Sequence, residues 1–253
     1  MRRYHIIACH IFWRELCHYA AQTDDILFTF NFLRQGLHNE PSVLRAETQA
    51  AVDAASNLPE FSKDVRGTAA TSMSRPDAIL LGYGLCSNGI VGIKASTVPL
   101  IVPRAHDCIT LFLGAKEEYR RLFDSFPGTY WYTTGWNETG TMPGPDRFDL
   151  LKQKYVEKYG EDNAAFLIET EMSWIEKYKM ALYVDLGLGD SERHIDYTKR
   201  CAEYCKWDYK YVKGDPRLFK SFVSGEWNDQ DFQVVQPGQS IEPSYTDTII
   251  KAK

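Results

Sequence analysis

The feature that most constrains the fold is an alternation of short, nearly continuous apolar runs with helical segments. Runs of this kind indicate strands that are buried on both faces, as in parallel sheets covered by helices. The sequence therefore predicts an α/β fold: a three-layer, doubly wound, mostly parallel sheet with helices on both faces. Strands are expected at 2–9, 25–32, 76–84, 97–105, 129–136, 208–213 and 231–238, and helices at 10–21, 39–58, 87–96, 108–126 and 216–227.

The chain of 253 residues is long enough for one large α/β domain or two small ones. Residues 1–136 are expected to form the α/β core. Residues 137–148 concentrate glycine, proline and polar side chains, which is typical of a linker or a lid. Residues 149–253 read as a helical and βα continuation, expected to pack on the same sheet, with a separate lobe as the alternative.

The charge balance excludes some partners. A net charge of −5 argues against nucleic acid or an anionic membrane as a main partner. No apolar run reaches the length of a membrane-spanning helix, and the N-terminus lacks the features of a signal peptide. A cytoplasmic protein is therefore expected. In a reducing compartment its six cysteines are better explained as metal ligands, catalytic groups or core residues than as disulfides.

Three of these cysteines share one position relative to a predicted strand. Cys9, Cys86 and Cys108 each follow an apolar strand and precede a predicted helix. Because open α/β sheets bind ligands at the carboxyl ends of their strands, the three thiols are expected to meet at one edge. Cys9 can join only if its strand lies beside the other two. A helix N-terminus should also lower each thiol pKa and so favour a thiolate ligand.

Two metal centres suit these groups. Three converging thiolates fit an iron–sulfur cluster with one iron left open for substrate, which we place first. Alternatively, His106 and Cys108 form a His-x-Cys pair that could hold zinc together with another cysteine. A cysteine by itself is more often a core residue than a ligand. His106 and Asp107 are the candidate catalytic residues, since His106 next to a metal could act as a general acid.

Several neighbouring polar side chains are candidates for substrate binding. Arg104 could hold a carboxylate or phosphate, or form a structural ion pair with Asp107 or Glu15. Ser87 and Asn88 lie where the next helix is expected to start, as caps or as donors to substrate. Trp136 could stack on a flat ligand or simply pack in the core. The full set is Arg104, Asn88, Ser87, Trp136 and Glu15.

The remaining cysteines are explained more simply by packing. Cys17, on the first predicted helix, is expected to be a core residue. Cys201 and Cys205 could share a helix face with His194 as a second metal site. Packing against Tyr197 and Tyr204 is the better explanation of this pair.

The blocks "YGLCSNGIVGIKA" (83–95) and "PLIVPRAHDCITLFLG" (99–114) resemble the domain-of-unknown-function family number 1638, over most of the chain. This resemblance implies a setting in anaerobic microbes, often near genes for corrinoid-dependent methyl transfer from methylamines. The His-x-Cys pair is also similar to part of the zinc motif of methylcobamide:thiol methyltransferases.

Three hypotheses remain at this stage. The first is a metal-dependent enzyme, such as a methyltransferase or redox enzyme, or an accessory protein, of anaerobic one-carbon metabolism. It acts on a small-molecule or corrinoid ligand and has a methyltransferase protein as a possible partner. The second is a corrinoid- or nucleotide-binding module or methyltransferase chaperone without its own metal. The third is a metal-free thiol enzyme with Cys108 as nucleophile and His106 as base.

Overall fold

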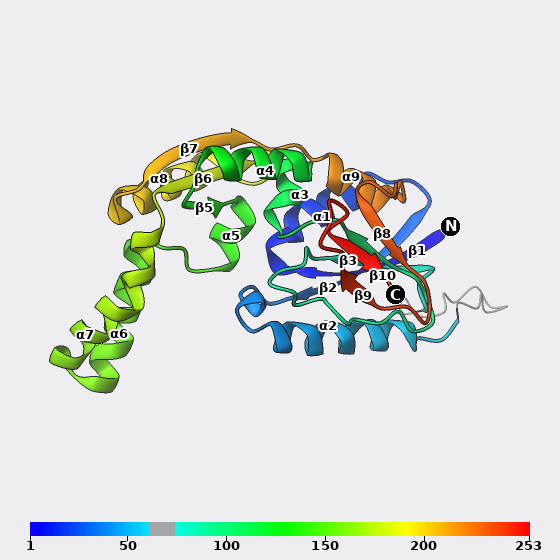
Figure 1. Cartoon of the computed structure of the whole chain (residues 1–253), viewed down its shortest axis with the longest axis horizontal. Coiled ribbons are helices and arrows are strands. Elements are labelled where there is room, and N and C mark those ends of the chain that lie inside the picture. The colour runs from blue at the N-terminus through cyan, green and yellow to red at the C-terminus, as the bar shows by residue number, and fades with distance from the viewer. Residues whose placement is uncertain (61–73) are drawn as a thin grey trace. The chain divides into compact units, whose positions relative to one another are not determined.

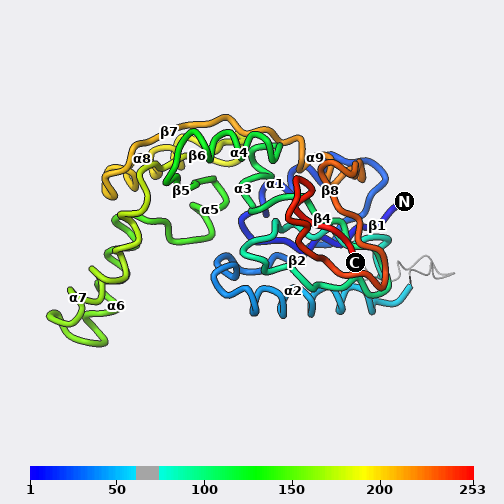
Figure 2. The backbone as a smooth tube through the Cα atoms, viewed as in Figure 1, coloured from blue at the N-terminus to red at the C-terminus, as the bar shows by residue number. Residues whose placement is uncertain are grey.

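The structure is a computed structural model that describes residues 1–60 and 74–253. The chain divides into two compact units (Figure 1). The first unit contains Met1–Lys116 and Asp215–Lys253, and the second contains Glu117–Gly214. The second unit is thus an insertion in the first, and the tube in Figure 2 shows the blue N-terminal and red C-terminal segments together in the first unit.

The first unit is built on a five-stranded sheet with the order β2-β1-β3-β4-β8. The first four strands are parallel, and β8 pairs antiparallel with β4. β3 and β4 are buried along their whole length, as their continuous apolar sequences require. The strands are β1 (Arg2–Cys9), β2 (Ile26–Leu33), β3 (Ala78–Gly82), β4 (Leu100–Pro103) and β8 (Phe232–Val235).

Helices pack against this sheet from the segments between its strands. α2, with Pro41 in its first turn as expected for a helix start, contacts β1 and β2. α1 packs against α9, and aromatic rings of Phe12, Phe112 and Phe219 meet beside them. The elements are η1 (His10–Phe12), α1 (Trp13–Ala20), η2 (Leu37–Asn39), α2 (Pro41–Ser56), α3 (Ile109–Leu113) and α9 (Arg217–Ser224), with the hairpin β9 (Ile241–Pro243) and β10 (Ile250–Ala252).

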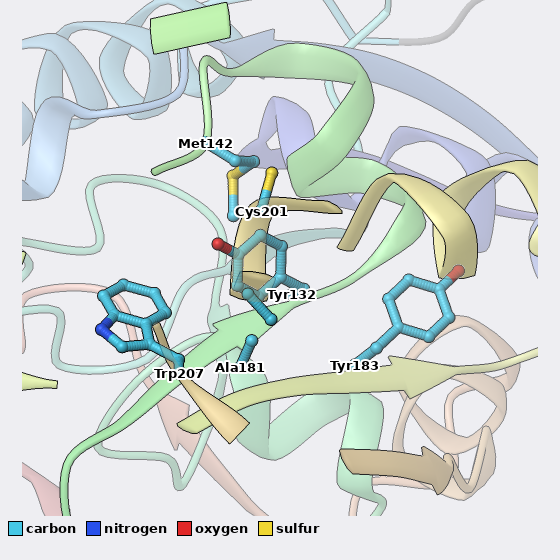
Figure 3. Packing of buried hydrophobic residues seen from close by; sticks show 7 residues of the cluster. Tyr132, Met142, Ala181, Tyr183, Cys201 and Trp207 are labelled. Atoms are coloured by element: carbon cyan, nitrogen blue, oxygen red, sulfur yellow. The ribbon is translucent and has the colours of Figure 1, made fainter. Parts of the chain in front are cut away.

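The second unit has its own parallel sheet with the order β5-β6-β7. Figure 3 shows its core, where Tyr132, Met142, Cys201 and Trp207 pack together. Its strands are β5 (Thr129–Tyr132), β6 (Met180–Asp185) and β7 (Asp208–Lys213). Its helices are α4 (Lys116–Ser125), which starts at the boundary, α5 (Thr134–Thr139), α6 (Pro145–Tyr159), α7 (Glu161–Met172), η3 (Ser173–Lys177) and α8 (Ser191–Cys205).

The structure confirms a mixed α/β fold with mostly parallel sheets but corrects the expected domain boundaries. Residues 129–136 and 149–214 belong to the second unit, whereas residues 215–253 return to the first unit, where β8 joins the five-stranded sheet. The segment 137–148 is a connection within the second unit, where Met142 is buried, and does not link two domains. The sequence does not reveal the boundary between the two units, because residues 108–126 have the pattern of a single helix. Gly114, at φ 75°, instead ends α3 and separates it from α4.

Two further findings concern single segments. Residues 87–96, expected as a helix, instead form consecutive turns up to Gly92, followed by extended chain in which Lys94 makes a β-bridge with Ser240. In the part of the chain that the structure describes, we find no helix with the length and apolar character needed to span a bilayer.

Candidate thiol site

Three buried cysteines follow three neighbouring strands of the first unit. Cys9 ends β1, Cys86 lies shortly after β3, and Cys108 lies shortly after β4. Because β1, β3 and β4 are adjacent and parallel, their carboxyl ends lie at the same edge of the sheet. The strand neighbourhood on which convergence depends is therefore confirmed.

Two of the thiols are in contact. The Sγ atoms of Cys86 and Cys108 lie 3.4 Å apart. A disulfide would require about 2.05 Å. Two thiolates on one tetrahedral zinc with bonds near 2.3 Å would lie about 3.8 Å apart. The pair is therefore spaced as reduced thiols that one metal ion could bridge after a small movement.

The two loops that carry this pair are joined through their backbones. The amide of Leu85 donates to the carbonyl of Ala105 at 2.9 Å, and the amide of Cys86 donates to that of His106 at 3.0 Å. A Cβ at Gly84 would lie 2.9 Å from backbone atoms of Asp107. The glycine next to this site thus allows the two loops to touch, and only a residue without a side chain permits that approach.

The turn after Cys86 has an unusual backbone. Cys86, Ser87 and Asn88 have φ angles of 46°, 58° and 62°, which place three successive non-glycine residues in the left-handed region. Such residues cost roughly 1–3 kcal/mol each and persist only where surrounding contacts hold them. The amide of Gly89 donates to the Cys86 carbonyl at 3.0 Å and closes the turn.

The expectation that helix N-termini lower the thiol pKa values is wrong. Burial, followed by the charge of Cys108, raises the pKa of Cys9 to about 12. The hydrogen bond with Cys86, followed by burial, raises the pKa of Cys108 well above its ordinary value. No helix follows Cys86, and α3 after Cys108 has only five residues. The thiols of Cys9 and Cys108 are therefore protonated near neutral pH unless a bound cation stabilises their anions.

Tyr83 adds a buried hydroxyl that sequence reasoning did not single out. The residue is 3% exposed, and its hydroxyl has no hydrogen-bond partner among the described residues. Burial first, and then the charges of Cys9, Cys108 and Cys86, raise its pKa. Buried polar atoms are almost always paired, so this one needs an explanation. The sequence signal that could have identified Tyr83 is its position shortly before Cys86, in "YGLC".

The described residues contain no group of three or more histidine, cysteine, aspartate or glutamate side chains already arranged to hold a metal ion. The sulfur atoms of Cys86 and Cys108 are in contact. Cys9 is related to this pair by the charge of Cys108, which raises the pKa of the Cys9 thiol. Any centre bound by all three thiols would therefore require the third to move.

The two candidate catalytic residues lie between β4 and α3. The His106 side chain is exposed, and its backbone carbonyl accepts the hydrogen bond from Cys86. The carboxylate of Asp107 accepts a hydrogen bond from the Ile109 amide at 3.1 Å, in the turn that precedes α3.

Arg104 has a different environment from the one expected. Its guanidinium donates to the carbonyls of Asp229 at 2.8 Å, Thr248 at 2.9 Å and Ile250, and to Oε1 of Gln233 at 2.9 Å. These acceptors lie in the C-terminal segment of the first unit. The side chain thus fastens that segment to the end of β4, which supports a structural role.

The other predicted substrate-binding residues have separate locations. Ser87 and Asn88 are exposed in the turn that follows Cys86, so they remain available to a ligand there. Glu15 is 1% exposed in α1 and is not a solvated side chain. Trp136 belongs to the second unit, where it packs against the core in Figure 3.

The remaining cysteines lie outside this site. Cys201 is fully buried in the core of the second unit, with Tyr197 and Cys205 packed against that core. Tyr204, which was also expected to pack there, is instead 41% exposed. His194 instead faces Glu138 with 3.5 Å between Nε2 and Oε1. Cys17, expected in the core, is only half-buried and lines a groove beside β2.

The first unit is thus that of an α/β protein with a thiol cluster at the carboxyl edge of its parallel strands. The chain belongs to the family described as "Protein of unknown function (DUF1638)", whose model matches residues 32–223. Comparisons with curated proteins and with solved structures gave no match.

Proposed function

We propose that the first unit binds a soft metal centre through Cys9, Cys86 and Cys108, with an iron–sulfur cluster as the first choice and zinc as the alternative. The single observation that carries the proposal is the 3.4 Å contact between the sulfurs of Cys86 and Cys108. Thiolates are the protein ligands that iron–sulfur clusters and zinc share. The buried Tyr83 hydroxyl supports the proposal, because a bound cluster or thiolate would supply its missing hydrogen-bond acceptor.

The position in the sheet also favours a ligand site. β2 lies on one side of β1 and β3 on the other, so the direction in which the chain adds strands reverses between β1 and β3. Open α/β sheets bind ligands at the carboxyl ends of the strands flanking such a reversal. We take the first unit as a three-layer, doubly wound fold, with α2 and α1 on opposite faces, and Cys9 and Cys86 flank its reversal point.

The residues define what the centre would do. Three thiolates leave one iron, or one position on zinc, open to polarise or bind a substrate. The exposed side chains of Ser87 and Asn88 are placed to contact that substrate, and Tyr83 would donate a hydrogen bond to the ligand shell. We propose a cytoplasmic metal-dependent enzyme or accessory protein of one-carbon metabolism, linked to corrinoid-dependent methyl transfer and a partner methyltransferase, acting on a small molecule.

A metal-free enzyme with Cys108 as nucleophile is less well supported. Its thiol pKa is raised rather than lowered, whereas a nucleophilic cysteine needs a lowered value. The His106 side chain, the base in that mechanism, is exposed to solvent whereas Cys108 is buried.

The test is metal analysis of protein that is expressed and purified without oxygen. We expect iron with acid-labile sulfide, or zinc, in fixed ratio to protein, and loss of that metal in Cys9→Ser, Cys86→Ser and Cys108→Ser. Cys17→Ser is the matched control, since this half-buried thiol lies in the same unit and should leave the metal in place. Circular dichroism shows whether each variant folds. A folded wild-type protein that neither carries metal nor takes it up would refute the proposal.

A further inference from the structure

The strand β2 forms one edge of the first sheet and lacks two of the usual protections of an edge, charged residues and proline. Its sequence, ILFTFNFL, contains no charged residue and no proline over eight residues. Natural edge strands are commonly short, charged, proline-containing or covered, because an open edge pairs with other chains. No strand of the described chain pairs with its outer side. A long apolar edge of this kind indicates a partner strand.

One face of β2 carries a ladder of aromatic rings beside a groove. The rings of Phe28 and Phe30 stack with centroids 6.1 Å apart, and those of Phe30 and Phe32 with centroids 5.7 Å apart. Phe30, in the middle of this ladder, is 37% exposed. A groove of about 330 Å³ lies between this face and the end of α1, and its walls include Cys17, Ala20, Ala21, Ile26, Phe28 and Phe30.

The sequence of the strand is complementary to itself. A two-fold axis perpendicular to the sheet keeps each face on its own side, so opposite residues have the same parity. With the axis at Thr29, this residue pairs with its own copy, and Phe28 lies opposite Phe30. The flanks then complement each other in charge, because Asp24 faces Arg34. Asp24 has no ion pair among the described residues, and Arg34 has only a 3.8 Å contact with Glu47.

We infer that two copies of this chain pair antiparallel along β2 and form a two-fold symmetric dimer with a sheet that continues from one copy into the other. The pairing satisfies the open edge, covers Phe30 against the partner's Phe28, and places an Asp24–Arg34 ion pair at each end. This interface uses the edge strand and does not depend on any metal at the thiol site.

A cysteine at the two-fold axis tests the register. Directly opposite residues in an antiparallel pair have Cα atoms about 4.5–5.5 Å apart, within disulfide range. Thr29→Cys should therefore give a disulfide-linked dimer on mild oxidation, identified by mass spectrometry of the joined peptide. Asn31→Cys is the matched control on the same face. Its two copies would be offset by four residues, roughly 13 Å along the strand, and should not link.

Molar mass in solution tests the interface itself. Wild-type protein should be a dimer by light scattering after gel filtration, and Phe30→Lys should be a folded monomer by the same measurement and circular dichroism. Asp24→Arg should weaken dimerisation about threefold to thirtyfold, because it removes two rim ion pairs, and the double variant Asp24→Arg/Arg34→Asp should restore it. A monomeric wild-type protein, or a dimer in which Thr29→Cys does not link, would overturn the inference.

Discussion

The sulfur atoms of Cys86 and Cys108 lie 3.4 Å apart although 22 positions separate the two residues in the chain. Neighbouring parallel strands bring the two loops to one edge, and backbone hydrogen bonds from Leu85 and Cys86 then hold them together. The backbone hydrogen bonds between the two loops therefore hold the two thiols in contact. This arrangement leads to four predictions about the thiol site and its supports.

Gly84→Ala should separate the two loops. The added methyl group would lie 2.9 Å from the Asp107 backbone, which cannot move aside as a flexible side chain could. We expect a loss of about 1–3 kcal/mol in the free energy of unfolding, as for other overpacked sites, together with weaker metal retention. Urea denaturation and metal analysis measure both. Unchanged stability would show that the loops do not touch here.

Tyr83→Phe should distinguish a ligand-facing hydroxyl from a structural one. In metal-free protein this variant should be as stable as wild type or up to about 1–3 kcal/mol more stable, because it removes a buried hydroxyl without a partner. Tyr132→Phe is the control, since that hydroxyl donates to the Pro143 carbonyl at 3.0 Å and its loss should cost about 0.5–1.5 kcal/mol. Equal destabilisation by both variants would contradict the assignment.

The thiol cluster should destabilise the metal-free protein in alkali. The pKa of Cys9 rises from an ordinary 9.0 to about 12 on folding, so between these values the folded chain binds more protons than the unfolded chain. The free energy of unfolding therefore falls as pH rises through this window, and is unaffected below pH 9. Urea denaturation should show that the stability difference between wild-type protein and a Cys9/Cys86/Cys108 triple serine variant changes with pH only in this range. Parallel pH curves would exclude the raised thiol pKa values.

Arg104→Lys should loosen the C-terminal segment of the first unit. The ammonium group of a lysine cannot make all the hydrogen bonds that the guanidinium donates to Asp229, Thr248 and Gln233. We expect a loss of about 1–3 kcal/mol and faster amide hydrogen exchange in residues 241–252. A variant with unchanged exchange and stability but impaired ligand binding would instead favour the substrate-binding role.

The sequence predicts the strands and the edge at which the thiols meet, but it does not predict how the thiols are held. Continuous apolar runs such as "AILLG" identify parallel strands because burial on both faces leaves no polar positions. The sequence predicts a helix over 87–96 and not the turn at Cys86–Asn88, because left-handed conformation in three ordinary residues depends on distant contacts. The backbone approach of Gly84 to Asp107 is equally long-range.

The same limit explains two other differences. For Arg104 the sequence leaves substrate binding and a nearby ion pair open, and it does not predict the backbone acceptors, because these lie more than a hundred residues away. The domain boundary was hidden by a helical pattern on both sides of Gly114, where only the glycine marks the end of a helix.

The insertion of one unit into the other sets an order for biosynthesis. Residues 117–214 are contiguous, so the ribosome delivers everything that the second unit needs before residue 232, where β8 starts. The first sheet, by contrast, cannot be completed until β8 and the carbonyl groups that accept hydrogen bonds from Arg104 have been synthesised. During translation the inserted unit is therefore expected to fold first. The thiol-bearing strands are synthesised earlier, but their unit is complete only when residues 215–253 have followed.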